Sequence, residues 1–172
     1  DAGDTEDDVF TYTVSDGANT TTATITITVT GINDDPVAQN DVGVIAEDST
    51  LTVANGANAN ETDDTGSTYD ATGEHSGDVI DTSSSSHTDS DPDASASLTI
   101  THIKKSGGSN STVSSGSSYD SSGTSVIGDY GTLTIGADGS YTYAATKDAT
   151  DALDKGDEVT AVSYTHLRAH ET

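Results

Sequence analysis

The stretch VFTYTVSDGANTTTATITITVTGI (residues 9–32) carries the clearest structural signal in the chain. Apolar and threonine positions alternate through both of its halves, and a period of two in β-branched and aromatic residues is typical of a β-strand. The apolar members of these runs are Phe10, Tyr12, Val14, Ile25, Ile27 and Val29. Asp16 and Gly17 stand between the halves, where an Asp-Gly pair favours a tight reversal. The stretch therefore predicts a β-hairpin.

A second hairpin is predicted by YGTLTIGADGSYTYAA (residues 130–145), in which Ala-Asp-Gly supplies the turn. Shorter strand candidates are VGVIAED (42–48), STLTV (49–53), GDVID (77–81) and SLTITHI (97–103). The polar segment near 54–76 is expected to be a long loop or disordered, and the one near 104–123 is expected to be a second loop. Residues 146–156 suggest one helical turn. Many short strands between turn signals indicate an all-β fold, and we expect an antiparallel β-sandwich.

The segment NDDPVAQND (residues 33–41) follows the first hairpin. Pro36 has no N–H to donate to a strand ladder, and it biases the preceding Asp35 towards an extended backbone. We interpret this segment as a linker between two domains.

The composition limits the partners of the chain. Its 172 residues include 30 acidic and 5 basic ones, for a formal net charge of −25. We therefore expect no nucleic acid and no anionic membrane as partner, because both need basic patches. Such a charge suits a protein that collects cations. The chain has no Cys, hence no disulfide, and no apolar run long enough for membrane insertion.

A low apolar content leaves disorder as an alternative. Leu, Ile, Val and Phe total 27 of 172 residues, below the level at which a highly charged chain usually folds. A disordered acidic linker is therefore the competing interpretation. The two predicted hairpins favour the folded one.

Several blocks of the sequence resemble the VCBS repeat family, whose members are Ig-like or cadherin-like modules of large bacterial surface and secreted proteins, many of them adhesins. The matching blocks are FTYTVSDG (10–17), TATITITVTGINDDP (22–36), DSDPDASASLTIT (89–101), YGTLTIGADGSYTY (130–143) and LDKGDEVT (153–160). The resemblance implies an Ig-like or cadherin-like antiparallel β-sandwich, repeated in tandem along a much longer chain.

The blocks stand in an unusual order. The two that come last in the family come first here, and the residues from Asp1 align with those from Asp154, one repeat of 153 residues further on. The resemblance therefore implies a fragment cut out of register with the repeat. Residues 1–33 would form the C-terminal hairpin of a preceding module. Residues 34–161 would form the next module without its last strands and with the polar insertions near 54–76 and 104–123, and we expect such a fragment to be unstable alone.

The last eleven residues, VSYTHLRAHET (162–172), differ from the rest. They contain Arg168, the only Arg of the chain, and two of its five His residues. The peptide resembles a translated sequencing-library adaptor and stands where the family would continue with a strand. We therefore hypothesise that residues 162–172 are not native sequence and give them no functional role. The alternative is a natural C-terminal strand.

Three acidic clusters offer the oxygen ligands that calcium prefers. They comprise Asn33, Asp34 and Asp35 at the domain junction, Glu47 and Asp48 at the start of the second module, and Asp89, Asp91 and Asp93. In the third cluster, carboxylates at every second residue can converge on one ion where the loop turns. The junction cluster resembles the calcium-binding linkers of cadherin-like arrays. We predict calcium at these clusters, and the alternative is a set of solvated acidic loops.

Signals for catalysis are weak. His87 lies near Asp89 in a Ser-rich segment, but so many Ser and Asp residues produce such a grouping by coincidence. No nucleophile-elbow or zinc-helix motif occurs, and we expect no enzymatic activity. Tyr12, Tyr141 and Tyr143 offer a sugar-stacking face, although tyrosines in alternating strands more often form cross-strand pairs.

Together these observations predict a structural spacer repeat of a large exported bacterial protein, stiffened by calcium and serving cell-surface adhesion or biofilm attachment. Its expected partners are the neighbouring repeats of the same chain, and its expected location is extracellular, at the bacterial surface. The alternative is a binding module that itself contacts a surface polysaccharide or a host or substrate surface.

Overall fold

The computed structural model describes residues 2–58, 74–80, 87–94, 96–151 and 153, together with the backbone of the strand at 163–170. Most of the polar insertion near 54–76, and the block at 154–160, lie outside the described residues. The described strands are β1 (Thr5–Ser15), β2 (Thr20–Thr30), β3 (Gly43–Val44), β4 (Thr50–Val53), β5 (Glu74–His75), β6 (Ser97–Lys105), β7 (Ser111–Thr112), β8 (Thr124–Ile127), β9 (Thr132–Ile135), β10 (Tyr141–Ala144) and β11 (Ser163–His170). These residues contain no helix, so the predicted all-β class is confirmed.

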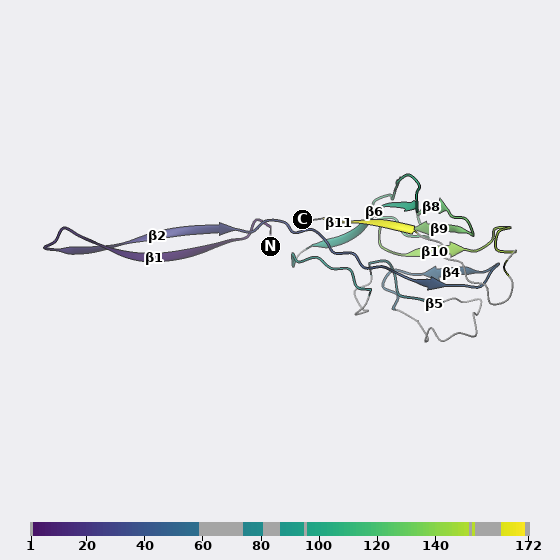
Figure 1. Ribbon diagram of the computed structural model, residues 1–172, viewed down its shortest axis with the longest axis horizontal. Coiled ribbons are helices and arrows are strands. Elements are labelled where there is room, and N and C mark those ends of the chain that lie inside the picture. Colours follow the sequence, from purple (N-terminus) through teal and green to yellow (C-terminus); the bar gives the residue numbers. More distant parts are fainter. Residues whose placement is uncertain are drawn as a thin grey trace.

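The first predicted hairpin is confirmed as β1 and β2, which pair in antiparallel register along their whole length. Its turn is closed by the carboxylate of Asp16, which accepts hydrogen bonds from the N–H groups of Ala18 and Asn19 at 2.9 and 2.7 Å. Gly17 has a φ of 91°, which glycine adopts without steric cost. The hairpin extends away from all the other strands as a long two-stranded ribbon (Figure 1).

The strands from β3 to β11 form a second unit, which we call the body. It contains a four-stranded sheet in the order β4-β10-β9-β8, a three-stranded sheet in the order β11-β6-β7, and the short pair β3-β5. All the neighbouring strands are antiparallel. The second predicted hairpin is confirmed as β9 and β10, and Gly139 in its turn has a φ of 88°.

The core of the body is built by both of its larger sheets. On β4, Leu51 and Val53 are buried while the threonines between them are exposed, which is the alternation that a half-buried strand requires. The buried hydrophobic residues of the core are Leu51, Val53, Ile100, Ile103, Val113, Ile135, Ala137 and Tyr141. Apolar side chains from two sheets therefore meet in one cluster.

Two local predictions are wrong for the residues that the structure describes. The segment at 77–81 is not a strand in its described part, because the carboxylate of Asp78 accepts the N–H of Ile80 at 2.9 Å and closes a turn there. The strand of this region is β5, just before it. Residues 146–151 form no helix. They form only a turn, in which the backbone N–H of Thr150 donates to the carbonyl of Lys147 at 2.8 Å. No helix in the described residues has the length and apolar character of a membrane span.

Candidate functional site

The linker that follows the first hairpin docks onto the acidic loop around residues 89–93. Val37 and Ser90 exchange two backbone hydrogen bonds, of 2.8 and 3.0 Å. This isolated bridge joins segments that lie far apart in the sequence. Two of the predicted calcium clusters, the junction and the 89–93 loop, are therefore brought together.

Two carboxylates of this loop hold the linker backbone. The N–H of Asp34 donates to Asp93 Oδ2 at 2.8 Å, and the N–H of Gln39 donates to Asp89 Oδ1 at 2.6 Å. Asp89 and Asp93 are only 4% and 5% exposed. A buried carboxylate is costly unless it accepts hydrogen bonds, and these amides supply them. We call residues 34–39, together with these two carboxylates, the docked linker.

Asp91 stands between these two residues and is arranged differently. Its Oδ1 accepts the N–H of Asp93 at 2.8 Å, but its Oδ2 is buried and has no hydrogen-bond partner among the described residues. A buried oxygen without a donor is unfavourable by about 1–3 kcal/mol. Asp91 Oδ2 is therefore the carboxylate oxygen of this loop that is buried without a donor among the described residues.

The side chains of the other predicted ligands do not join this group. Asn33, Asp34 and Asp35 are exposed, so their side chains face solvent. Glu47 and Asp48 are exposed in a separate turn, where the N–H of Asp48 donates to the carbonyl of Ala145 at 2.8 Å. Among the residues that the structure describes, no three His, Asp or Glu side chains are grouped so as to hold a metal ion.

A buried polar cluster beside the linker was not predicted. Asp41 accepts a hydrogen bond from the hydroxyl of Ser76 at 3.1 Å, and that hydroxyl in turn accepts the N–H of Val42 at 3.0 Å. Ser76 and Asp78 are 0% and 3% exposed. They belong to the tetrapeptide His-Ser-Gly-Asp, which carries no period or motif, so only long-range packing identifies the cluster.

Burial alters the acidity of this region. It raises the pKa of Asp41 to about 6, against the opposing effect of the hydrogen bond from Ser76, and the negative charge of Asp89 adds to the rise. Burial also raises the pKa of Asp89, although the N–H of Gln39 stabilises its charged form. Both carboxyls therefore hold protons more firmly than a solvated aspartate.

The tyrosines and His87 do not form the sites that their positions suggested. Tyr141 is buried in the core at 7% exposure, whereas Tyr12 is 49% exposed on the separate hairpin, so the two share no face. Tyr143 is partly buried against the core. His87 contacts the backbone carbonyl of Asn40 through Nδ1. Tyr141 and Tyr143 therefore pack in the core, and His87 contacts the backbone.

A hollow of about 420 Å³ lies on the body. Its lining residues are Asn55, Gly56, Asp78, Ile80, Ser97, Leu98, Thr99, Gly116, Ala137 and Asp138. Its carboxylates already hold loops: Asp78 accepts the N–H groups of Gly56 and Ile80, and Asp138 accepts the N–H of Ser140 at 3.1 Å. The polar groups of the hollow thus serve the fold.

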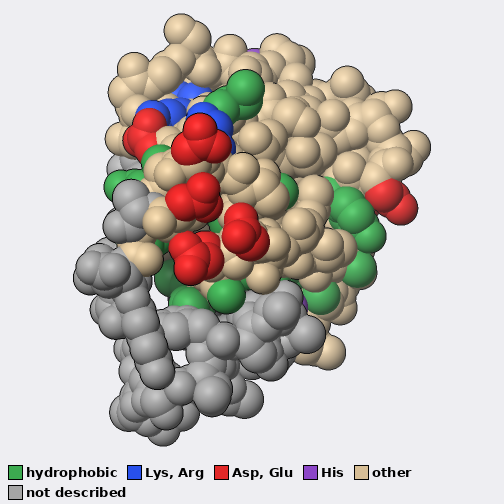
Figure 2. Space-filling view, turned by 90° about the vertical axis from the view of Figure 1, so that its right-hand side faces the viewer, with side chains coloured by type: hydrophobic (Ala, Val, Ile, Leu, Met, Phe, Trp, Pro, Cys, Tyr) green, Lys and Arg blue, Asp and Glu red, His purple; other side chains and the backbone are tan. Residues whose placement is uncertain are grey.

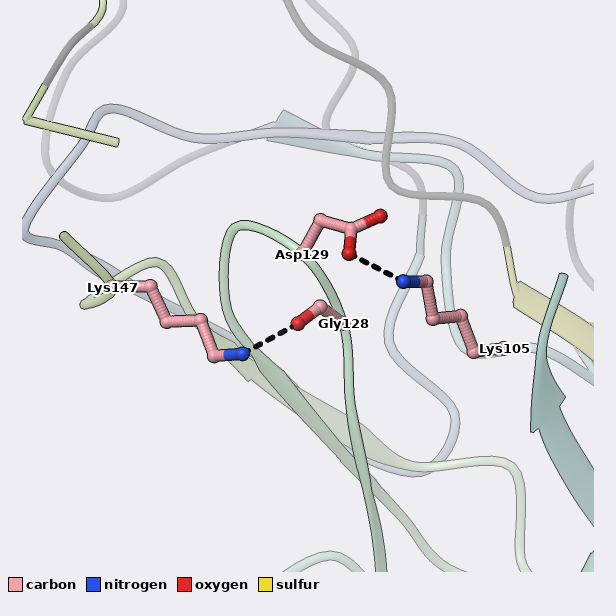
Figure 3. A network of polar contacts seen from close by, with 4 residues as sticks. All are labelled: Lys105, Gly128, Asp129 and Lys147. Carbon is pink, nitrogen blue, oxygen red and sulfur yellow. Dashed lines mark hydrogen bonds and ion pairs between the residues drawn. The ribbon is translucent and has the colours of Figure 1, made fainter. Parts of the chain in front are cut away.

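Two of the few lysines hold one turn of the body (Figure 3). Lys105 forms an ion pair with Asp129, and Lys147 Nζ donates to the carbonyl of Gly128 at 2.7 Å. The hydrogen bond from Lys105, together with the charge of that lysine, lowers the pKa of Asp129. On the end of the body away from the hairpin, Asp and Glu side chains gather close together (Figure 2). Lys side chains lie next to these acidic side chains on the same face (Figure 2).

The fold and its contacts define an all-β protein with a two-stranded ribbon joined to a sheet-built body by a docked linker. Comparisons of the chain with models of protein families, with curated proteins and with solved structures find no match.

Proposed function

We propose that this chain is a structural spacer in a large exported bacterial protein made of tandem repeats, and that it serves cell-surface adhesion. The observation that carries the proposal is the docked linker, in which Asp89 and Asp93 hold the backbone of residues 34–39. A spacer must keep a fixed angle between successive modules. A linker tied to buried carboxylates restricts that angle, whereas a free linker would not.

The arrangement of the sheets supports this role. The body has one core to which two sheets contribute, as an Ig-like or cadherin-like β-sandwich requires. The β1–β2 ribbon forms a sheet of its own and pairs with no described strand of the body. This supports its assignment as the end of a preceding module, which follows from the resemblance of residues 10–36 to the VCBS repeat. Neighbouring repeats are then the partners.

The proposal includes calcium at the 89–93 loop. Carboxylate oxygens are the ligands that calcium prefers, and Asp91 Oδ2 is buried without a partner. Asp89 and Asp93 each use one oxygen for the linker and retain the other. Because no three carboxylates converge among the described residues, backbone oxygens or water would complete the ligand set. A bound cation would offset the charge repulsion at the junction.

Hydrogen exchange of the full chain tests the docked linker. The amides of Asp34 and Gln39 are expected to exchange more slowly than that of Asp35, which makes no described hydrogen bond. In Asp93→Ala, exchange at Asp34 should become fast. Equally fast exchange at all three amides of the unaltered chain would overturn the spacer proposal.

Thermal unfolding followed by circular dichroism tests calcium separately. A ligand that binds only the folded state adds about 2.7 kcal/mol at a hundredfold excess over its Kd, so the melting temperature should rise in calcium and fall in chelator. Asp91→Ala should lose this response, and the exposed Asp148→Ala should keep it. Equal melting of the unaltered chain in both conditions would remove calcium from the proposal and leave the docked linker standing.

A further inference from the structure

One face of the β1–β2 hairpin is exposed and mainly apolar, with Glu6 and Asp8 opposite Val29 and Ile27 at one end of it. Residues that pair across the strands lie on the same face, so Phe10 shares a face with Ile25, and Tyr12 with Ala23. The large members of this face, which we call the hairpin apolar face, are Phe10, Tyr12, Val14, Ile25, Ile27 and Val29. Each is between 48% and 61% exposed. The hairpin projects away from the body of its own chain (Figure 1).

Such a face needs a second layer. A sheet with one apolar face is stable when that face packs on another element, and an isolated two-stranded hairpin is marginal in water. Six half-exposed side chains offer on the order of 500 Å² per copy, which suffices for the smaller class of specific interfaces. The hairpin apolar face therefore requires a complementary surface to pack on.

An internal repeat indicates the position that β1 takes in a complete body. Asp1, Gly3 and Asp4 recur 153 residues later as Asp154, Gly156 and Asp157. The same offset places Phe10 at the first residue of β11. In the structure β11 pairs with β6, at one edge of the three-stranded sheet. By the 153-residue offset, β1 therefore corresponds to the strand that pairs with β6.

The register shows that β1 suits this place better than β11 does. Thr165 and Leu167 of β11 lie opposite Ile103 and Ile100 of β6, which are 0% and 1% exposed. The offset of 153 residues gives these two positions to Tyr12 and Val14 in β1. Both are members of the hairpin apolar face, whereas β11 supplies one polar residue.

Two further features agree with this arrangement. With the hairpin beside β6, the three-stranded sheet would become a four-stranded one, in the order β2-β1-β6-β7, and match the four strands of the opposite sheet. The acidic residues Asp7 and Asp8, which precede Phe10, would fall at the end of β6 that carries Lys104 and Lys105. Opposite charges would then lie close together at this end of β6.

We propose that the hairpin of one chain inserts beside β6 of a second copy of the same chain, where β1 replaces β11 and the hairpin apolar face covers the core residues of that copy. The contact joins two different surfaces. Reciprocal exchange closes a dimer, and one-way exchange extends a row of chains. This inference stands on the internal repeat and the register, independently of calcium.

Directed cross-linking of full-length chains tests the proposal, since the chain contains no Cys. Thr13 takes the position of His166, which pairs with His102 of β6. A Thr13→Cys chain mixed with a His102→Cys chain should therefore form a disulfide-linked heterodimer under mild oxidation. The control is Thr22→Cys, because Thr22 pairs with Thr13 on the far strand of the hairpin.

The control lies one strand further from His102, roughly 10 Å away in the proposed arrangement, beyond the reach of a disulfide. The Thr13 pair is expected to give at least about tenfold more heterodimer than the Thr22 pair. Equal yields from both pairs would overturn the proposal, and so would the absence of heterodimer from the Thr13 pair.

Sedimentation velocity provides a second readout that does not depend on new cysteines. The unaltered chain should associate as its concentration rises, and Tyr12→Lys should weaken this association at least about tenfold, because it places a charge on the covered face. Thr11→Lys puts the same charge on the opposite face of β1 and should leave association within about twofold. A monomer at every concentration, or equal effects of both substitutions, would contradict the exchange.

Discussion

At the scale of single residues, the buried carboxylates act on distant backbone. Asp93 is 5% exposed and accepts the N–H of Asp34 from across the linker. Asp93→Ala removes this acceptor and leaves the amide without its partner. We expect the free energy of unfolding to fall by about 1–3 kcal/mol, measured by urea denaturation.

The exposed Asp35→Ala is the matched control, since it removes the same charge from the same junction without removing a described hydrogen bond. It should change the free energy of unfolding by less than about 0.5 kcal/mol. If both substitutions had the same effect, the net charge of the junction would matter and the acceptor role of Asp93 would not.

Asp41 links stability to pH. Its pKa is about 6 in the folded chain and about 3.9 when unfolded, so the folded state binds more protons between these values. Its contribution to stability is therefore full below about pH 4 and declines as the pH rises through 6. Asp41→Asn removes the charge and keeps an acceptor for Ser76. It should stabilise the fold at pH 7.5 by on the order of 1 kcal/mol, discounted for partial exposure.

Thermal melts at pH 4 and pH 7.5 check this expectation, because the gain from Asp41→Asn should vanish at the lower pH. The exposed Asp148→Asn should behave alike at both values. A variant Asp41→Asn that is less stable than the unaltered chain at pH 7.5 would show that the charged carboxylate is needed.

The acidic clusters could be found from the sequence, but their partners could not. Alternating carboxylates at Asp89, Asp91 and Asp93 are visible in any reading of the chain. The donors that satisfy them are backbone N–H groups of a segment some fifty residues away, and every residue except proline carries such a group. No local pattern therefore distinguishes a docked carboxylate from a solvated one.

At the scale of elements, the β9–β10 hairpin depends on a glycine beside it. A Cβ at Gly131 would come within 2.3 Å of the carbonyl oxygen of Ala144 and 2.6 Å of the ring of Tyr143. Because the first of these atoms is backbone, the strand itself must shift. Gly131→Ala is expected to destabilise the fold by about 1–3 kcal/mol in thermal or urea unfolding.

Gly128→Ala tests whether this loss is specific. It lies in the same loop, and its Cβ would meet only the carbonyl oxygen of Gly131, at 3.3 Å. We expect a change of less than about 1 kcal/mol. Equal losses at both positions would indicate that the loop simply requires flexibility and that the close approach to β10 has no special weight.

The two hairpins were predictable because their signals are local. Each combines a period of two with a Gly-containing turn, and each forms where expected. The strands β3, β5 and β7 have only two residues each, too few for any period to be read. Strand β8 was missed because TSVI follows a Ser- and Gly-rich segment, and its pairing with β9 is what fixes it.

At the scale of the whole molecule, charge works against association. A net charge of −25 makes two copies repel, and only five basic residues oppose it. Lys105 and Lys147 are both engaged with the turn at Gly128 and Asp129. Apolar contact must therefore drive any contact between copies, with local charge pairs guiding its register.

Strand β11 and the hairpin of a second copy would compete for one place, since only one strand can pair with that edge of β6. Replacing residues 162–172 by a Gly/Ser segment of equal length removes the competitor and keeps the chain length. Glycine and serine pair poorly as strands, so the place beside β6 opens. We expect the heterodisulfide between Thr13→Cys and His102→Cys to form several-fold faster, at lower protein concentration. The Thr22→Cys control should stay unlinked on the same background. If the replacement left the rate unchanged or lowered it, β11 would not occupy the place of β1, and the exchange would have to use another edge.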